Sequence, residues 1–84
     1  MVAKEMMVKS GTGLEAKPAA LFIQKAGGYK STIWVEKDER KANGKSLLGL
    51  LSLSIGNGTK ITLIAEGEDE EKAVKELEEY INSL

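Results

Sequence analysis

The sequence contains neither cysteine nor histidine. Their absence excludes a disulfide, a thiol nucleophile, an imidazole base and the commonest zinc sites. The first ten residues, MVAKEMMVKS, are charged and hold no apolar run of the length of a signal peptide, and no segment approaches the run of about 20 apolar residues of a membrane span. We therefore expect a cytoplasmic protein that binds no membrane, metal or cofactor. Without a recognisable catalytic constellation, we also expect that it is not an enzyme.

An excess of basic charge is lacking as well. The 84 residues include 12 Lys and Arg against 13 Asp and Glu, a net charge of −1. Such a balance argues against direct binding to a phosphate backbone. Tyr29 and Trp34 could stack on single-stranded bases, but no basic stretch surrounds them. The length predicts one domain, over residues 1–84, with one modest core.

The hydrophobic periodicity gives the order of elements. A period of two predicts strands, a period near 3.6 predicts helices, and Ser-Gly-rich segments predict turns such as the one at residues 10–13. The predicted strands cover residues 2–8, 31–37, 40–43 and 60–66. The predicted helices are one over 16–26, a short one that starts at 47, and one that lies within 68–84. The apolar faces expected of the first and last helices are Ala19, Phe22, Ile23 and Ala26, and Ala73, Val74, Leu77, Ile81 and Leu84. This β-α-β-β-α-β-α order predicts an α+β open-faced β-sandwich, a four-stranded antiparallel sheet with three helices on one face.

Several apolar residues do not fit these faces. Ala20 and Leu21 lie beside the core stripe of the first helix, and four leucines nearly encircle a second helix that is too short to bury them all. They are Leu47, Leu48, Leu50 and Leu51. Scattered exposed leucines are normal. The alternative is one protein-binding patch built from both helices, with a rim of Lys17, Gln24, Lys45 and Ser52.

Ser46 precedes the second helix and is predicted to cap it. The segment "NGKS" resembles the end of a phosphate-binding P-loop, but Glu39 stands where that motif needs glycine. A second interpretation of Ser46 is phosphorylation, since a phosphate is favoured at the N-terminal end of a helix. Lys45, and with it Lys41, are the cations expected to meet such a phosphate.

Three segments carry a family resemblance. "TGLEAKPAALFIQKA", "KSLLGLLSL" and "GTKITLIAEGEDEEKAVKELEEYI" together resemble HPr, the phosphocarrier of the bacterial sugar phosphotransferase system, over nearly the whole chain. The resemblance implies the same open-faced sandwich. In HPr the first motif reads G-[IL]-H-A-R-P-A, and its His carries the phosphate. Here Glu15 occupies the His position and Lys17 the Arg position.

A subset of that family, the Crh type, lacks the His and keeps the serine that matches Ser46. The resemblance implies phosphorylation of Ser46 by HPr kinase/phosphorylase. It also implies action as corepressor of a CcpA-type LacI-family regulator in carbon catabolite repression. The partner surface so implied comprises Lys17, Ala20, Leu21, Gln24, Leu47, Leu48, Leu51 and Ser52, with Lys45 at its rim. The alternative is an altered or engineered phosphocarrier in which Glu15 replaces the phosphorylated His.

Overall fold

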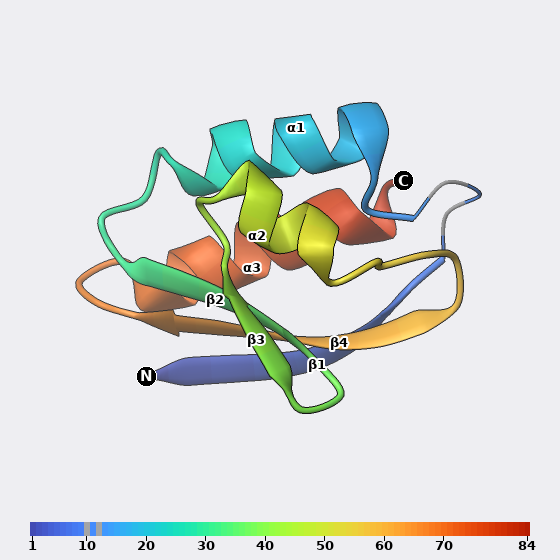
Figure 1. Ribbon diagram of the computed structural model, residues 1–84. Coiled ribbons are helices and arrows are strands. Elements are labelled where there is room, and N and C mark those ends of the chain that lie inside the picture. Colours follow the sequence, from blue (N-terminus) through green and yellow to red (C-terminus); the bar gives the residue numbers. More distant parts are fainter. Residues whose placement is uncertain (10, 12) are drawn as a thin grey trace.

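The computed structural model describes residues 1–9, 11 and 13–84, and it has the predicted order of elements (Figure 1). The predicted turn at 10–13 includes Ser10 and Thr12, which lie outside the described residues. The strands are β1 (Val2–Val8), β2 (Thr32–Lys37), β3 (Arg40–Asn43) and β4 (Thr59–Glu66), and the helices are α1 (Ala16–Ala26), α2 (Leu47–Ser52) and α3 (Glu70–Asn82). The predicted fold class is confirmed.

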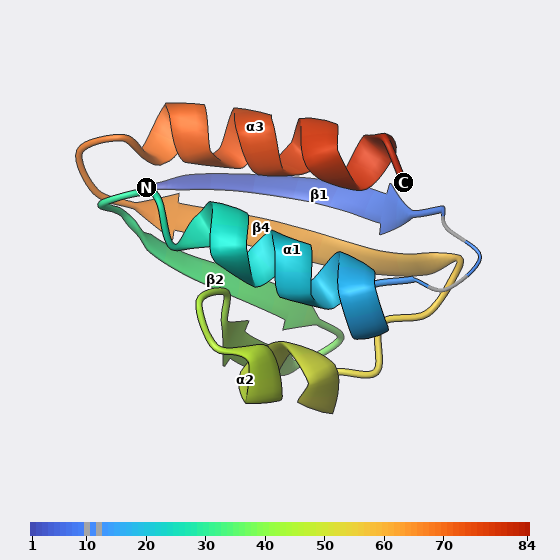
Figure 2. The same cartoon turned by 90° about the horizontal axis from the view of Figure 1, so that it is seen from above.

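The four strands form one antiparallel sheet in the order β1-β4-β2-β3. The last strand of the chain, β4, therefore lies between the first two. In the middle of the sheet Val35 of β2 pairs with Leu63 of β4 on one side and with Ala42 of β3 on the other. All three helices lie on one face of this sheet, with α1 between α3 and α2 (Figure 2).

The core lies between the sheet and the helices. Alternate strand residues such as Val8, Ile33 and Leu63 are buried there, as expected when one face of a strand is covered. Phe22 of α1 and Leu77 of α3 are fully buried against them. Ile23 and Leu84, which the periodicity placed on the core faces, are only half-buried, because each lies at the border of the packed layer. No helix in the described ranges is long and apolar enough to cross a bilayer.

The opposite face of the sheet has no helix over it. Trp34 is half-buried there, and the Nζ atom of Lys41 lies 5.2 Å from the centre of its ring. Tyr29 is elsewhere: it packs against the core, and its hydroxyl donates to Oε1 of Glu76. The two aromatic side chains considered for base stacking therefore do not form a common platform.

The loop before β2 is fixed by the start of α3. The carboxylate of Asp69 accepts hydrogen bonds from the backbone N–H groups of Lys30 and Ser31, both at 2.9 Å, and from the Ser31 hydroxyl. The Ser31 hydroxyl and these N–H groups lower the pKa of Asp69 to about 2. Ser31 is fully buried, so its polar atoms need such a partner.

Candidate functional site

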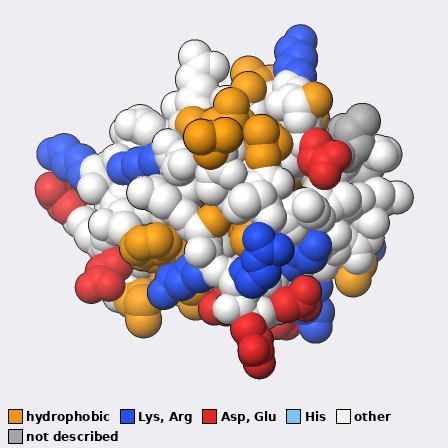
Figure 3. Space-filling model, in the orientation of Figure 1, with side chains coloured by type: hydrophobic (Ala, Val, Ile, Leu, Met, Phe, Trp, Pro, Cys, Tyr) orange, Lys and Arg blue, Asp and Glu red, His pale blue; other side chains and the backbone are white. Residues whose placement is uncertain are grey.

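The exposed leucines lie on α1 and α2, which pack against each other. Leu48 is 83% exposed, whereas Leu21, Leu47 and Leu51 are each close to 40% exposed. Leu50 is the leucine of α2 that faces the core. Figure 3 shows hydrophobic side chains gathered over the region where the two helices lie side by side. The prediction that some leucines must face water is confirmed.

We call this region the α1–α2 surface. It consists of the leucines Leu21, Leu47, Leu48 and Leu51 with Lys17, Ala20, Gln24, Lys45 and Ser52. All of these residues are exposed except Lys45, which is half-buried. The structure thus brings the residues predicted for a partner surface onto two neighbouring helices, except Lys45, which lies in the turn before α2. That the surface binds a protein stays a prediction.

Ser46 lies at the start of α2 and caps it as predicted. Its backbone is extended, and its Oγ atom accepts a hydrogen bond from the N–H of Gly49 at 3.1 Å. Its carbonyl accepts from the N–H of Leu50 at 2.9 Å. The side chain is half-buried and stands immediately before the exposed Leu47 and Leu48. A group added to Oγ would therefore lie at the edge of the α1–α2 surface.

In the unmodified chain the two lysines expected to meet a phosphate on Ser46 contact other groups, so that expectation stays a prediction. Nζ of Lys45 donates to the carbonyl of Tyr29 at 2.6 Å. Lys41 lies over Trp34 on the face of the sheet that carries no helices. Lys41 points to that face because successive side chains of a strand alternate between its two sides and Ala42 is buried on the other.

The far end of α2 is held by two cations that the sequence analysis did not identify. Nζ of Lys37 donates to the carbonyls of Leu53 and Ser54 at 2.9 and 3.0 Å, and Nη2 of Arg40 donates to the carbonyl of Ser52 at 2.7 Å. These carbonyls have no partner within the helix, and positive charge is favoured beside them. The β2–β3 hairpin thus fixes α2 from its C-terminal end. In the sequence, these contacts are indicated by nothing more than two basic residues, Lys37 and Arg40, on either side of a predicted turn.

Glu15 stands at the start of α1 without acting as a cap. Its backbone is extended, its side chain is exposed, and it makes no capping hydrogen bond. The next residue, Ala16, has a positive φ of 53°, which is rare for a residue with a side chain. Gly13, just before, also has a positive φ, and a Cβ there would lie 2.2 Å from the carbonyl oxygen of Ile55. The result is a tightly constrained backbone that presents an exposed carboxylate.

Gly44, which lies two residues before Ser46, is required by packing. A Cβ at Gly44 would lie 2.6 Å from Cγ2 of Ile33, and its N–H donates to the carbonyl of Ile33 at 2.7 Å. The residue is buried and belongs to the support of α2 rather than to its exposed side. Within the described ranges no group of three acidic side chains could hold a metal ion.

Comparison with known proteins gives a consistent result. The family model described as "PTS HPr component phosphorylation site" matches residues 2–83. The chain is 53% identical to the HPr-like protein Crh of Halalkalibacterium halodurans over 96% of each chain. It is 46% identical to the phosphocarrier protein HPr of Borreliella burgdorferi, over 100% of this chain and 98% of that one.

Among solved structures, HPr-C-His from Thermoanaerobacter tengcongensis superposes with a TM-score of 0.97 at 48% identity, over 99% of this chain and 93% of that one. Sequence identity alone does not decide between the Crh type and HPr itself, because 53% identity to a Crh protein and 46% identity to an HPr are close values. Both share this fold and nearly the full length of this chain. The chain therefore belongs to the HPr family of the phosphotransferase system.

Proposed function

We propose that this chain is a non-catalytic regulatory protein of the Crh type, acting as one HPr-like domain over residues 1–84. In this proposal an HPr kinase/phosphorylase phosphorylates Ser46. The phosphorylated protein then acts as corepressor of a CcpA-type LacI-family regulator in carbon catabolite repression. The observation that carries the proposal is the placement of the Ser46 hydroxyl beside the exposed leucines of α2.

The proposed modification is an ordinary phosphoryl transfer. A base of the kinase takes the proton of the Ser46 hydroxyl, the bond from Oγ to the γ-phosphorus of ATP forms, and the bond to the ADP oxygen breaks. The new group adds about −1.5 to −2 charges at the N-terminal end of α2, where the helix dipole favours them. The Oγ atom that now accepts from Gly49 stays an acceptor in the ester.

The phosphate would be available to a partner. Because Lys45 is bound to the Tyr29 carbonyl and Lys41 lies on the other side of the sheet, neither neutralises it in the present arrangement. An arginine of the regulator could then form a bidentate, charge-assisted contact with it, a kind of hydrogen bond worth roughly 1.5–3 kcal/mol. The leucines beside Ser46 would supply the apolar part of the same interface.

The direct test is phosphorylation with purified HPr kinase/phosphorylase and ATP, followed by intact-protein mass spectrometry. The wild type should gain one phosphoryl group, and Ser46→Ala should gain none. Ser52→Ala is the matched control, because Ser52 is an exposed serine on the same helix. A wild type that stays unmodified, or an adduct that survives in Ser46→Ala, contradicts the proposal.

An altered phosphocarrier is the second candidate, and the exposed carboxylate of Glu15 at the family's phosphorylation position is what favours it. Phosphorylation there would give an acyl phosphate. Incubation with Enzyme I and phosphoenolpyruvate separates the two functions. We expect no label, whereas a hydroxylamine-sensitive label that is lost in Glu15→Gln would establish the phosphocarrier.

A further inference from the structure

Two of the three asparagines in the sequence stand directly before a glycine: Asn43 before Gly44, and Asn57 before Gly58. A glycine leaves its own backbone nitrogen unshielded and gives the backbone its greatest freedom. That nitrogen can attack the side-chain amide of the preceding asparagine, which is the usual start of spontaneous deamidation. The attack requires the asparagine side chain to swing over the nitrogen, so the surroundings of each pair decide whether it reacts.

The pair Asn43 and Gly44 is fixed by the sheet and by packing. Asn43 ends β3 opposite Trp34 of β2, and its Oδ1 atom accepts a hydrogen bond from the backbone N–H of Lys45 at 2.8 Å. Gly44 is buried, and a Cβ there would lie 2.6 Å from Cγ2 of Ile33. A packed backbone of this kind cannot rotate without moving its neighbours. The folded structure therefore protects this pair from deamidation.

The pair Asn57 and Gly58 lies in an exposed turn between α2 and β4. The turn is closed by a long hydrogen bond, 3.3 Å, from the N–H of Thr59 to the carbonyl of Gly56. Chain neighbours aside, no described atom lies within 4 Å of the place where either glycine of the turn would carry a Cβ. The N–H of Gly58 donates to the carbonyl of Val8 at 2.7 Å. Once this bond opens, the Asn57 side chain has room to turn over the next nitrogen.

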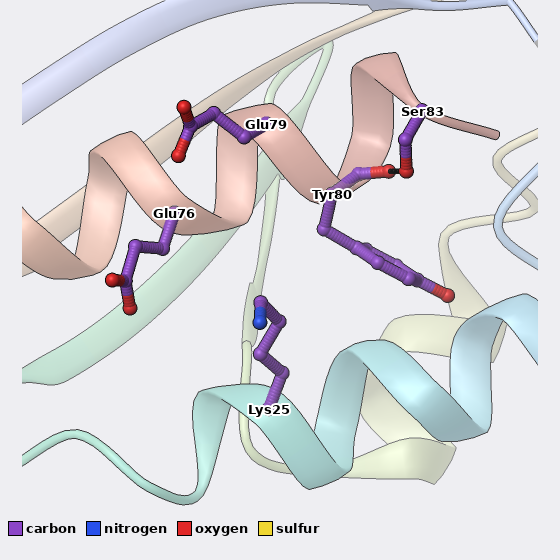
Figure 4. A pocket seen from close by; sticks show the side chains of 5 residues that line it. All are labelled: Lys25, Glu76, Glu79, Tyr80 and Ser83. Atoms are coloured by element: carbon purple, nitrogen blue, oxygen red, sulfur yellow. Dashed lines mark hydrogen bonds between the residues drawn. The ribbon is translucent and has the colours of Figure 1, made fainter.

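The third asparagine, Asn82, is the last residue of α3 and precedes Ser83. The N–H of Ser83 donates to the carbonyls of Glu79 and Tyr80, both at 3.1 Å. Its hydroxyl donates to the carbonyl of Tyr80 at 2.7 Å, and Figure 4 shows this bond at the end of the helix. A serine side chain also shields its own nitrogen more than a glycine does. Asn82 is therefore the least reactive of the three by sequence and is held by helical hydrogen bonds as well.

We propose that Asn57 is a site of spontaneous deamidation in the folded chain, whereas Asn43 reacts only when the chain unfolds. The nitrogen of Gly58 loses its proton to hydroxide and attacks Cγ of Asn57, and the amide nitrogen takes up a proton from water and leaves as ammonia. Water then opens the resulting succinimide at either carbonyl, which leaves aspartate or isoaspartate at position 57. Each product adds one negative charge to a chain whose net charge is −1. Isoaspartate also inserts a methylene group into the backbone, which displaces the Gly58 N–H from the carbonyl of Val8.

The test is incubation of the folded chain at mildly alkaline pH, followed by peptide mass spectrometry that resolves the three asparagines. Position 57 should convert at least about tenfold faster than position 43, because a site that reacts only after the structure opens is slowed by its opening equilibrium. In concentrated urea, which removes both the turn and the sheet, the two rates should agree within about twofold. No kinase takes part, so the outcome is independent of the proposed phosphorylation of Ser46.

Asn57→Gln is the matched control, because the longer side chain forms the corresponding ring far more slowly. A protein isoaspartate methyltransferase with S-adenosylmethionine should methylate the incubated wild type, and it should methylate the incubated Asn57→Gln variant much less. Equal conversion at positions 43 and 57 in the folded chain, faster conversion at position 43, or conversion at position 57 in urea alone would overturn the proposal.

Discussion

The two helices of the α1–α2 surface differ in how their first residue is capped and in what stabilises them. α1 starts at Glu15, which makes no capping bond, but its 11 residues bury Ala19, Phe22 and Ala26 in the core. α2 starts at Ser46, which caps it, but its 6 residues bury only Leu50. A helix of six residues is unstable by itself in water. α1 is thus stabilised mainly by burial of its core face, and α2 mainly by hydrogen bonds at its two ends.

This difference bears on the two candidate positions of phosphate chemistry. A change at the start of α1 leaves the packing of that helix intact, so the helix tolerates a glutamate at position 15. A change at Ser46 acts on a helix that depends on that residue. The proposed phosphate on Ser46 would therefore alter both the charge and the stability of the segment that presents Leu47, Leu48 and Leu51.

The largest effect is expected where the core is broken. Phe22 is fully buried, so Phe22→Ala should cost about 3–5 kcal/mol of the free energy of unfolding. Urea unfolding followed through the single tryptophan, Trp34, measures this loss. Leu48→Ala is the matched control, because Leu48 is 83% exposed and should change stability by less than about 0.5 kcal/mol. Equal losses of the free energy of unfolding in the two variants would mean that α1 is not stabilised by burial of its core face.

The next largest effect on stability is expected from removal of the cation at the C-terminal end of α2. Lys37→Met should destabilise the end of α2 by about 1 kcal/mol, because the carbonyls of Leu53 and Ser54 lose their charged donor. Hydrogen exchange should become faster at the amides of Leu53 and Ser54. Lys41→Met, a change on the same hairpin but over Trp34, should leave these amides unaffected. No change in exchange would show that the hairpin does not hold α2.

The caps themselves provide the sharpest contrast. Ser46→Ala should cost about 1 kcal/mol, the usual value for loss of a serine cap. Glu15→Ala should change stability by no more than about 0.5 kcal/mol, since no hydrogen bond of its side chain is lost. Thermal unfolding of the two variants beside the wild type measures both values. A larger cost at Glu15 than at Ser46 would reverse the comparison.

The start of α3 offers a third arrangement, and it predicts a pH dependence. Asp69 precedes this helix but directs its carboxylate to Ser31 and Lys30, and its pKa of about 2 lies below the ordinary value of 3.8. A lowered pKa means that the stabilisation is complete above the ordinary value and is lost as the pH falls toward 2.

The urea midpoint of the wild type should therefore decline over this interval, and it should decline less in Asp69→Asn. Glu68→Gln, which removes a neighbouring exposed carboxylate, should keep the wild-type decline. A decline in Asp69→Asn as steep as that of the wild type would mean that this carboxylate does not carry the effect.

The elements and the surface could be predicted because they follow from local patterns. The period of 3.6 gave α1 its observed bounds, and the excess of leucines in α2 required that some of them be exposed. Which leucine turns inward, Leu50, depends on the position of the helix over the sheet. The direction of Lys41, the contacts of Lys37 and the positive φ of Ala16 depend on residues far along the chain. No local pattern contains that information.

The most direct test of the proposed regulatory function is the affinity of a CcpA-type LacI-family regulator for the chain before and after phosphorylation at Ser46. Isothermal titration with both forms should show the phosphorylated form binding at least about tenfold more tightly, the effect of one charge-assisted contact of roughly 1.5 kcal/mol. Equal affinity of the two forms would contradict the account.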